Sequence, residues 1–293
     1  MDTAELLKRI QRIEIKTKAL TQSNFAGDYH SAFKGRGMSF AEVREYREGD
    51  DVRDIDWNVT ARTSKPHVKV FEEERELCVM LLVDVSGSLK FGTRHQTMRD
   101  MAAELAATLA FSALDAGDKT GVIFFSDRIE AYLPPRKGKQ HILGIVRTLL
   151  SLQPQGRRTD VGKALEFLMR VQRRRAVVFL MSDFCAVPPF DTPLRIAAHR
   201  HDVMAIRLCD PLMEQLPRAG LWRVEDAETG HEEYVNTSSK RVRQAYAAWM
   251  AQENERLATT FKSAGCAAQR IRTDGDYIKP LKALFAMKGR LRG

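Results

Sequence analysis

Residues 77–88 have the sequence LCVMLLVDVSGS, in which an uninterrupted apolar run ends at Asp84. A continuous apolar run of this length is typical of a strand in a parallel sheet that is covered on both faces. Beyond it, oxygen-bearing side chains recur at every second position, Asp84, Ser86 and Ser88. Because ligand sites of open α/β sheets form at the carboxyl ends of strands, this turn stands where a binding site is expected.

Strand-like and helix-like segments alternate after this turn. The predicted strands are 77–83, 120–126, 129–133, 176–182, 202–208 and 267–273, and the predicted helices are 93–116, 140–152, 160–171, 193–200, 240–264 and a last one from Tyr277. This alternation predicts a doubly wound, Rossmann-like α/β sheet with helices on both faces. Thr93 and Gln96 are spaced as a capping box that would begin the helix 93–116, and Gly117 would end it. Its predicted buried stripe consists of Met98, Met101, Leu105 and Leu109.

The chain divides into three predicted parts. Residues 1–22 place apolar side chains at helical spacing and predict an amphipathic helix that packs on the main body. Residues 23–75 are rich in glycine, charge and short β-prone pieces, and predict a small irregular β-rich subdomain. Residues 76–293 are predicted to form the α/β domain, with a hairpin insertion near 220–237.

Charged residues of opposite sign alternate within the predicted 23–75 subdomain, and Trp57 stands among them. They are Arg44, Arg47, Asp50, Asp51, Arg53, Asp54, Asp56 and Arg62. We expect them to form an ion-pair network and Trp57 to be a large apolar anchor.

Composition places the chain among globular, intracellular proteins. It has 293 residues, 44% of them hydrophobic, and its longest apolar run is far shorter than the ~18 residues of a membrane helix. The charged start MDTAELLKRI does not resemble a signal peptide, so a cytoplasmic location without a membrane span is expected. Four cysteines are widely spaced without a Cys-x-x-Cys pair and are predicted to be reduced, mostly buried thiols. They are Cys78, Cys185, Cys209 and Cys266.

Two further segments can add ligands to the turn that begins at Asp84. Thr159 stands at a loop-to-helix junction, and Asp183 directly follows the apolar run 176–182. In the predicted topology both lie at the same sheet edge as Asp84, Ser86 and Ser88. Each could serve a local turn or cap by itself, but together they form a set of oxygen ligands that suits Mg²⁺, with Mn²⁺ as an alternative.

The pattern Asp-x-Ser-x-Ser at 84–88, with a distant Thr159 and a later Asp183, resembles the metal-ion-dependent adhesion site (MIDAS) of von Willebrand factor A domains. The resemblance implies that Ser86, Ser88 and Thr159 bind the metal directly, while the two aspartates act through water. Neutral direct ligands leave the cation electrophilic, so a Glu or Asp from a partner can complete its coordination.

The segment GRGMSFAEVREYREGDDVRDIDWNVTAR upstream, with HDVMAIRLCDP and VEDAETG downstream, resembles the bacterial "domain of unknown function 58" family. Members associate with MoxR-type AAA+ ATPases, which implies an adaptor or cochaperone role with such an ATPase, or its client, as partner. Arg157 and Arg158 stand before Thr159, where von Willebrand factor A domains often have glycine. These guanidinium groups can weaken cation binding or help to recruit an acidic partner.

Two other functions stay open at this level beside the non-enzymatic binding module. A Mg²⁺-dependent phosphohydrolase also places an Asp at the end of its first strand, but it usually needs a second carboxylate two positions on, where this chain has Ser86. The net charge of +9 and the basic runs 173–175 and 288–292 are compatible with nucleic-acid binding. No interleaved aromatic platform accompanies them, so solvated helix ends are the preferred interpretation.

Overall fold

The apolar run at 77–83 forms the centre of the sheet. In the structure, a computed structural model that describes residues 3–20, 26–33, 38–73, 76–93, 96–185 and 187–291, this run is strand β3 (Cys78–Asp84). Residues 79–84 are buried, as expected for a strand that is covered on both faces. Strand β3 pairs in parallel with β4 (Lys119–Phe125) on one side and with β6 (Val177–Ser182) on the other.

Six strands form the central sheet in the order β10-β7-β6-β3-β4-β5. Strands β7 (Asp202–Cys209) and β10 (Ala267–Arg272) continue the parallel arrangement, and β5 (Ile129–Arg136) runs antiparallel at the other edge. Since β3 and β6 are parallel neighbours with Val83 opposite Met181, the residues that follow them emerge side by side. The predicted strands are all confirmed.

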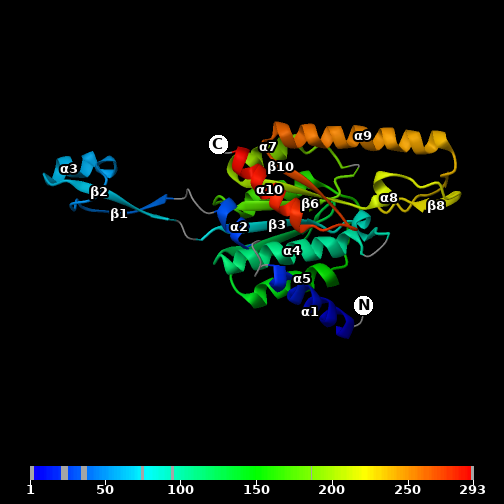
Figure 1. The fold of residues 1–293 in the computed structure, drawn as a ribbon, viewed down its shortest axis with the longest axis horizontal. Helices are drawn as coiled ribbons and strands as arrows, with labels where there is room; N and C mark the ends of the chain where they lie inside the picture. Colours follow the sequence, from blue (N-terminus) through cyan, green and yellow to red (C-terminus); the bar gives the residue numbers. More distant parts are fainter. Residues whose placement is uncertain are drawn as a thin grey trace. The chain divides into compact units, whose positions relative to one another are not determined.

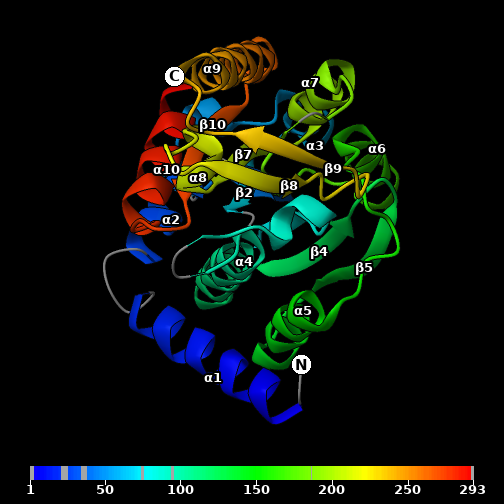
Figure 2. The same ribbon diagram turned by 90° about the vertical axis from the view of Figure 1, so that its right-hand side faces the viewer.

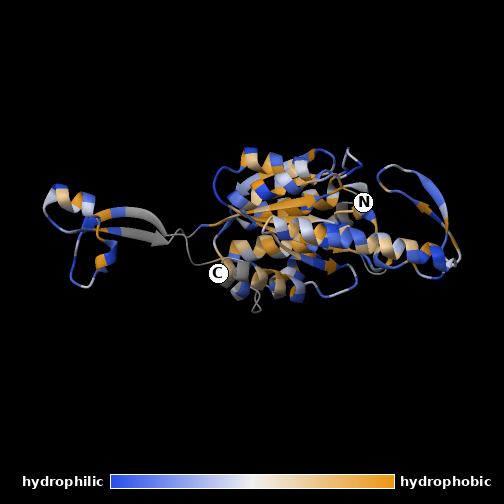
Figure 3. Cartoon of the chain, turned by 90° about the horizontal axis from the view of Figure 1, so that it is seen from above, coloured by the Kyte–Doolittle hydropathy of each residue, from blue (hydrophilic) through white to orange (hydrophobic). Residues whose placement is uncertain are grey.

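Helices cover both faces of this sheet (Figures 1 and 2). One face carries α6 (Val161–Val171), α7 (Asp191–Arg200) and α9 (Lys240–Ser263), and the other carries α4 (Met98–Asp115), α5 (Lys139–Ser151) and α10 (Ile278–Leu291). Leu165 of α6 and Phe261 of α9 pack on the first face, while the Phe285 ring of α10 lies 6.2 Å from that of Phe179 on the second. Figure 3 shows the hydrophobic central strands enclosed by helices with hydrophilic outer surfaces. The doubly wound α/β fold is confirmed.

Helix α4 begins later than the sequence indicates. Its N-cap is Thr97, whose hydroxyl accepts the backbone N–H of Asp100 while the Asp100 carboxylate accepts that of Thr97. The predicted capping box of Thr93 and Gln96 is therefore wrong, because both side chains serve tertiary contacts instead. The predicted stripe is buried, and the end at Gly117, with φ of +81°, is confirmed.

The predicted N-terminal helix is α1 (Thr3–Leu20), which packs against α4 and α5. Ile10 and Ile13 are buried on its inner face, and Arg9 and Lys16 pair with Asp100 and Glu104 of α4. The next helix is α2 (Ala26–Phe33), whose buried Tyr29 donates a 3.0 Å hydrogen bond to Asp118. Within the described ranges, no helix is both long enough and apolar enough to cross a bilayer.

Residues 33–76 form a compact unit distinct from the one built of residues 1–32 and 77–293. Strands β1 (Met38–Glu45) and β2 (His67–Glu73) pair antiparallel, with the short helices η2 (Val52–Asp54) and α3 (Trp57–Thr63) between them. The expected ion pairing is present between Arg44 and Asp50, with nitrogen–oxygen distances of 2.7 and 2.8 Å. Trp57 is not an apolar anchor, because it begins a helix without buried residues and is 70% exposed.

The hairpin expected near 220–237 consists of β8 (Leu221–Glu225) and β9 (Glu232–Asn236). It forms a two-stranded sheet outside the central one. The short helix α8 (Pro211–Glu214) precedes it, and buried Thr237 closes its base by donating its hydroxyl to the Gly220 carbonyl at 2.8 Å.

The four cysteines are free thiols, as predicted. Cys209 and Cys266 are buried, and Cys78 and Cys185 are half-buried. Burial raises the pKa of Cys185 and Cys266 to about 12, so these thiols are protonated and unreactive at neutral pH.

Candidate functional site

The predicted ligand residues lie at the carboxyl edge of the sheet. Asp84 ends β3, Ser86 follows it, Ser88 lies in the short helix η3 (Gly87–Lys90), Asp183 follows β6, and Thr159 precedes Asp160, the N-cap of α6. All are buried except Ser88, which is half-buried. The Ser86 and Ser88 hydroxyl oxygens are 3.1 Å apart, so they can share one small ligand.

A backbone hydrogen bond joins the serine turn to the loop of Thr159. The Gly87 N–H donates to the Arg157 carbonyl at 3.1 Å. The Asp160 N–H donates to the Ser126 carbonyl at 2.9 Å, which ties the same loop to the end of β4. Residues from three separate parts of the chain therefore meet at this edge.

Two hydrogen bonds orient the buried Asp84 carboxylate. Oδ1 accepts the Ser86 N–H at 2.8 Å, and Oδ2 accepts the Ser182 hydroxyl at 2.6 Å. Sequence reasoning did not single out Ser182, although a serine that ends an otherwise apolar strand was a usable signal. The Ser86 hydroxyl also acts on this carboxylate and lowers its pKa, against the larger effect of burial.

Asp183 is buried and incompletely satisfied. Its Oδ1 accepts the Cys185 N–H at 3.1 Å, and its carbonyl accepts Nε of Arg207 at 3.1 Å. Oδ2 is buried and has no hydrogen-bond partner among the described residues. A buried carboxylate oxygen without a partner destabilises the folded state. A cation or a water molecule bound to this oxygen would remove that destabilisation.

The chain turns sharply after Asp183. Phe184 has φ of 54°, a left-handed conformation that is rare for a bulky residue. Its N–H donates to the Ser182 hydroxyl at 3.0 Å, and its ring stacks on Phe190 with centroids 5.9 Å apart. Packing thus holds a strained backbone beside Asp183, and such strain often accompanies functional sites.

Both buried aspartates have raised pKa values. Burial, followed by the charge of Asp183, raises the pKa of Asp84 to about 7. Burial also raises the pKa of Asp183, while the Cys185 N–H, the Ser88 hydroxyl and then the Arg207 charge act in the opposite direction. Two like charges in a buried place are relieved by a divalent cation between them.

The donor set fits a hard cation. It consists of three hydroxyl and two carboxylate groups, without nitrogen or sulfur ligands, as Mg²⁺ and Mn²⁺ prefer. The described residues contain no group of three or more His, Cys, Asp or Glu side chains arranged to hold a metal ion. The predicted set differs from such a group in taking three of its oxygens from Ser86, Ser88 and Thr159.

A cavity of about 10 Å³ lies next to Asp183. Its lining includes Cys185, Arg207, Cys209 and Met250. This volume is about that needed to hold one water molecule.

Thr159 contacts a residue that the sequence did not reveal as part of the site. Its hydroxyl donates a 3.0 Å hydrogen bond to Oε1 of Glu228, at the tip of the β8–β9 hairpin. Burial raises the pKa of Glu228, and the charges of Asp183 and Asp226 act in the same direction. The hairpin thus brings a third carboxylate to the edge where Asp84 and Asp183 stand.

Arg157 and Arg158 are exposed. The backbone carbonyl of Arg157, rather than its guanidinium, binds the serine turn. The side chain of Arg157 lies near the hairpin, because a Cβ added to Gly230 would be 3.7 Å from Nη1 of Arg157. The Arg158 charge lowers the pKa of Glu228 against the larger effect of burial. Both cations therefore flank the site and remain accessible.

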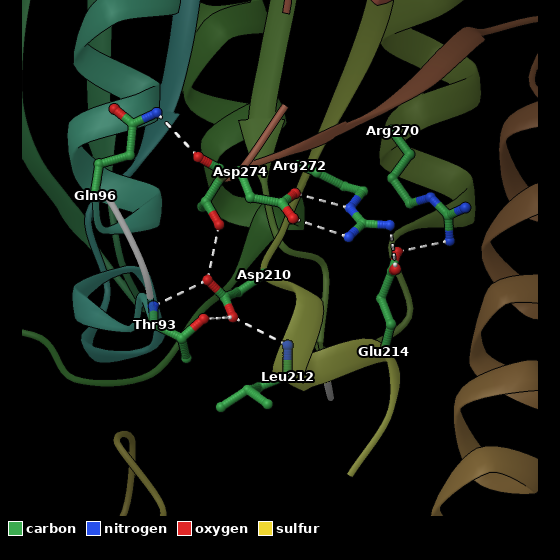
Figure 4. A network of polar contacts seen from close by, with 9 residues as sticks. Thr93, Gln96, Asp210, Leu212, Glu214, Arg270, Arg272 and Asp274 are labelled. Atoms are coloured by element: carbon green, nitrogen blue, oxygen red, sulfur yellow. Dashed lines mark hydrogen bonds and ion pairs between the residues drawn. The ribbon is translucent and has the colours of Figure 1, made fainter. Parts of the chain in front are cut away.

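Asp210 is another buried acid at this sheet edge, after β7, but it is fully hydrogen-bonded (Figure 4). Oδ1 accepts from the Thr93 hydroxyl at 2.7 Å and the Leu212 N–H at 3.0 Å, and Oδ2 accepts from the Thr93 N–H at 3.1 Å and the Thr273 hydroxyl at 2.7 Å. Although burial acts to raise its pKa, these bonds outweigh it and lower the pKa. Asp210 is a structural carboxylate, in contrast to Asp183.

Comparison with known proteins gives matches over most of the chain. The family model described as "Protein of unknown function DUF58" matches residues 42–256. An uncharacterised protein of Mycobacterium tuberculosis is 33% identical over 292 residues, which are 99% of this chain and 92% of the relative.

Solved structures similar to the chain include the conserved hypothetical protein BatB from Bacteroides thetaiotaomicron. Its identity is 17% and its TM-score 0.47, over 73% of this chain and 99% of that one. Proximal thread matrix protein 1 from the mussel byssus, in a structure with a zinc-occupied MIDAS motif, is 18% identical with a TM-score of 0.36, over 45% of this chain and 38% of that one.

Proposed function

Because the chain belongs to the DUF58 family, a family of unknown function, we propose its function from its own site: a non-enzymatic module that binds a protein partner through Mg²⁺. Ser86, Ser88 and Thr159 would hold the ion directly, and Asp84 and Asp183 would act through hydrogen bonds and water. Mn²⁺ is the alternative ion. The bound ion would supply an electrophilic centre for an acidic side chain of the partner.

The unpaired Oδ2 of Asp183 carries this proposal. It is buried at the same edge as Asp84, whose pKa is raised to about 7, and the Ser86 and Ser88 hydroxyls lie 3.1 Å apart in the adjoining turn. A divalent cation relieves the cost of both buried carboxylates at once, which a single proton or water does only in part. The fully bonded Asp210 shows how this fold satisfies an acid that needs no ion.

The chain's own residues would position the ion for binding. Ser182 holds Asp84 through its 2.6 Å hydrogen bond, and the Arg207 bond to the Asp183 carbonyl fixes the start of the next turn. Neutral hydroxyl ligands withdraw little of the ion's charge, so it stays attractive to a carboxylate. The exposed Arg157 and Arg158 would favour the approach of an acidic partner.

The proposed partner is a MoxR-type AAA+ ATPase or its client, with this chain as adaptor or cochaperone. Its support is the resemblance of the sequence to DUF58 members, which implies an association with such ATPases. A pull-down with the purified MoxR-type ATPase of the same organism should succeed with Mg²⁺ and fail with a chelator. Capture that neither chelator nor Asp183→Ala reduces would leave the ion without a role in binding.

Metal binding itself is tested by thermal unfolding and titration calorimetry. At about 100 times the dissociation constant, an ion that binds only the folded state adds roughly 2.7 kcal/mol, which should raise Tm by about 5 °C. Ser88→Ala and Asp183→Asn should abolish this increase. Asp210→Asn, a matched change of a buried strand-end acid, should lower the baseline Tm and keep the increase.

An enzymatic role predicts a different result. The purified chain would be assayed with phosphate esters and nucleotides in the presence of Mg²⁺. Robust turnover that Asp84→Ala abolishes would overturn the binding-module proposal.

A further inference from the structure

The tip of the β8–β9 hairpin has a well-defined conformation. Oδ1 of Asp226 accepts the N–H groups of Glu228 at 2.8 Å and Thr229 at 3.3 Å, and the Asp226 carbonyl accepts the Gly230 N–H at 2.7 Å. Gly230 has φ of +71°, which closes the turn. These local hydrogen bonds fix the backbone at Glu228 and so restrict where its side chain can lie.

This tip rests directly on the serine turn. A Cβ on Gly87 would stand 2.3 Å from the Ala227 carbonyl oxygen, closer than any two such atoms approach. The absence of a side chain between Ser86 and Ser88 is therefore what lets the hairpin backbone reach the site. The contact places the residue after Ala227, which is Glu228, against Thr159.

The hairpin carries a negative charge toward other negative charges. Glu228 is half-buried, and its Oε1 lies 3.0 Å from the Thr159 hydroxyl oxygen, at the sheet edge that also carries Asp84 and Asp183. A cation held by Thr159 would therefore have the Glu228 carboxylate beside it and would balance its charge.

We propose that Glu228 is an internal ligand: with the hairpin seated, its carboxylate occupies the place toward the metal that the acidic side chain of a partner would otherwise take. The inference rests on the proposed function and adds regulation to it. The partner must displace Glu228, so its apparent affinity equals its intrinsic affinity multiplied by the fraction of molecules in which the hairpin is lifted. The site is then closed until an acidic partner competes for it.

The test uses Mn²⁺ as the probe and the full chain. Glu228→Gln keeps an oxygen that accepts the Thr159 hydrogen bond and removes the charge, so the hairpin can remain seated. Calorimetry should show Mn²⁺ affinity lowered on the order of tenfold. The control Glu233→Gln removes an exposed carboxylate from the same hairpin and should bind Mn²⁺ like the unmodified chain.

Hydrogen exchange reports the hairpin independently of affinity. In the unmodified chain, Mn²⁺ should slow amide exchange both at 84–90 and at the tip, 226–231. In Glu228→Gln, the slowing should persist at 84–90 and be lost at the tip. Exchange without metal shows whether the variant's hairpin is still seated.

Acetate tests whether a foreign carboxylate can take the vacated place. In Glu228→Ala the truncated side chain leaves room, so acetate should recover part of the Mn²⁺ affinity, and it should have no such effect on the unmodified chain. No recovery, with Glu228→Gln and Glu233→Gln binding Mn²⁺ equally, would overturn the internal ligand.

The two proposals fail separately. If Mn²⁺ binds, Ser88→Ala abolishes binding, and neither affinity nor tip exchange depends on Glu228, the metal-dependent function stands and the internal ligand is wrong. If the unmodified chain and Glu228→Gln both show no heat and no protection at 84–90, the metal site itself is wrong.

Discussion

Ser182, the last residue of β6, donates a 2.6 Å hydrogen bond to Oδ2 of Asp84, the last residue of β3. Both residues are buried, and the same hydroxyl accepts the N–H of Phe184 at 3.0 Å. Ser182 thus orients the Asp84 carboxylate and also supports the strained turn that follows Asp183. The two neighbouring strands are coupled at the point where the metal is proposed to bind.

Ser182→Ala should therefore affect both stability and metal affinity. Loss of the hydroxyl leaves Oδ2 of Asp84 and the Phe184 N–H without a partner, at a cost of about 1–3 kcal/mol in unfolding free energy. Mg²⁺ affinity, measured by calorimetry, should fall as Asp84 loses its orientation. Ser112→Ala is the control, since buried Ser112 donates its hydroxyl to the Thr108 carbonyl at 2.8 Å within α4. Equal Mg²⁺ affinity in both variants would show that Ser182 is only structural.

Gly87→Ala should lift the hairpin without altering any carboxylate. The added methyl group cannot coexist with the Ala227 carbonyl 2.3 Å away, so the tip must move. We expect faster amide exchange at 226–231 and a lower Tm. Gly144→Ala in α5, where the added Cβ meets open space, should instead stabilise by about 0.5–1 kcal/mol. Unchanged tip exchange in Gly87→Ala would contradict the seating of the hairpin.

Asp210→Ala should destabilise the fold and leave divalent-ion binding intact. It removes the acceptor of the Thr93 and Thr273 hydroxyls in a buried place, and each orphaned donor costs about 1–3 kcal/mol. Urea unfolding with and without Mg²⁺ measures both quantities. A variant that loses the response to Mg²⁺ while still folded would show that Asp210 belongs to the metal site.

His201 should make stability depend on pH in the mildly acidic range. It is buried, and neither ring nitrogen has a hydrogen-bond partner in the described part of the chain. Burial first, and then the Arg200 charge, lower its pKa to about 4, against the opposing effect of Asp202. Between pH 6.5 and 4 the unfolded chain binds more protons at this residue than the folded chain does. The free energy of unfolding therefore decreases as the pH is lowered, by up to about 3 kcal/mol.

The variant His201→Phe isolates this contribution. Carboxylates titrate in the same range, so the relevant quantity is the difference between the two unfolding free energies as pH falls from 6.5 to 4. Over this range the unfolding free energy of the unmodified chain should decrease more than that of His201→Phe. Parallel curves would contradict a neutral, buried His201.

The fold was predictable because its signals are local. Each central strand is a short apolar run, and each helix after it has a 3.6-residue periodicity, so 77–83 and 176–182 could be assigned without tertiary information. The start of α4 was misplaced because Thr93 and Thr97 both suit an N-cap. Only the long-range contact of Thr93 with Asp210, 117 positions away, decides between them.

The candidate site was predictable in part for the same reason. Asp84, Ser86 and Ser88 stand together in sequence, and Thr159 and Asp183 follow from the rule that parallel strands end at one edge. Trp57 could not be placed, because a large apolar side chain signals burial only when a partner surface covers it, and here the side chain is 70% exposed.

The sequence by itself determined the α/β alternation and the oxygen-rich turn at 84–88, because residues adjacent along the chain specify both. Tertiary structure alone decided that Ser182 would orient Asp84, 98 positions away, and that Glu228 would meet Thr159, 69 positions away. These contacts depend on strand register and on the close approach of the hairpin to Gly87, which no local periodicity encodes.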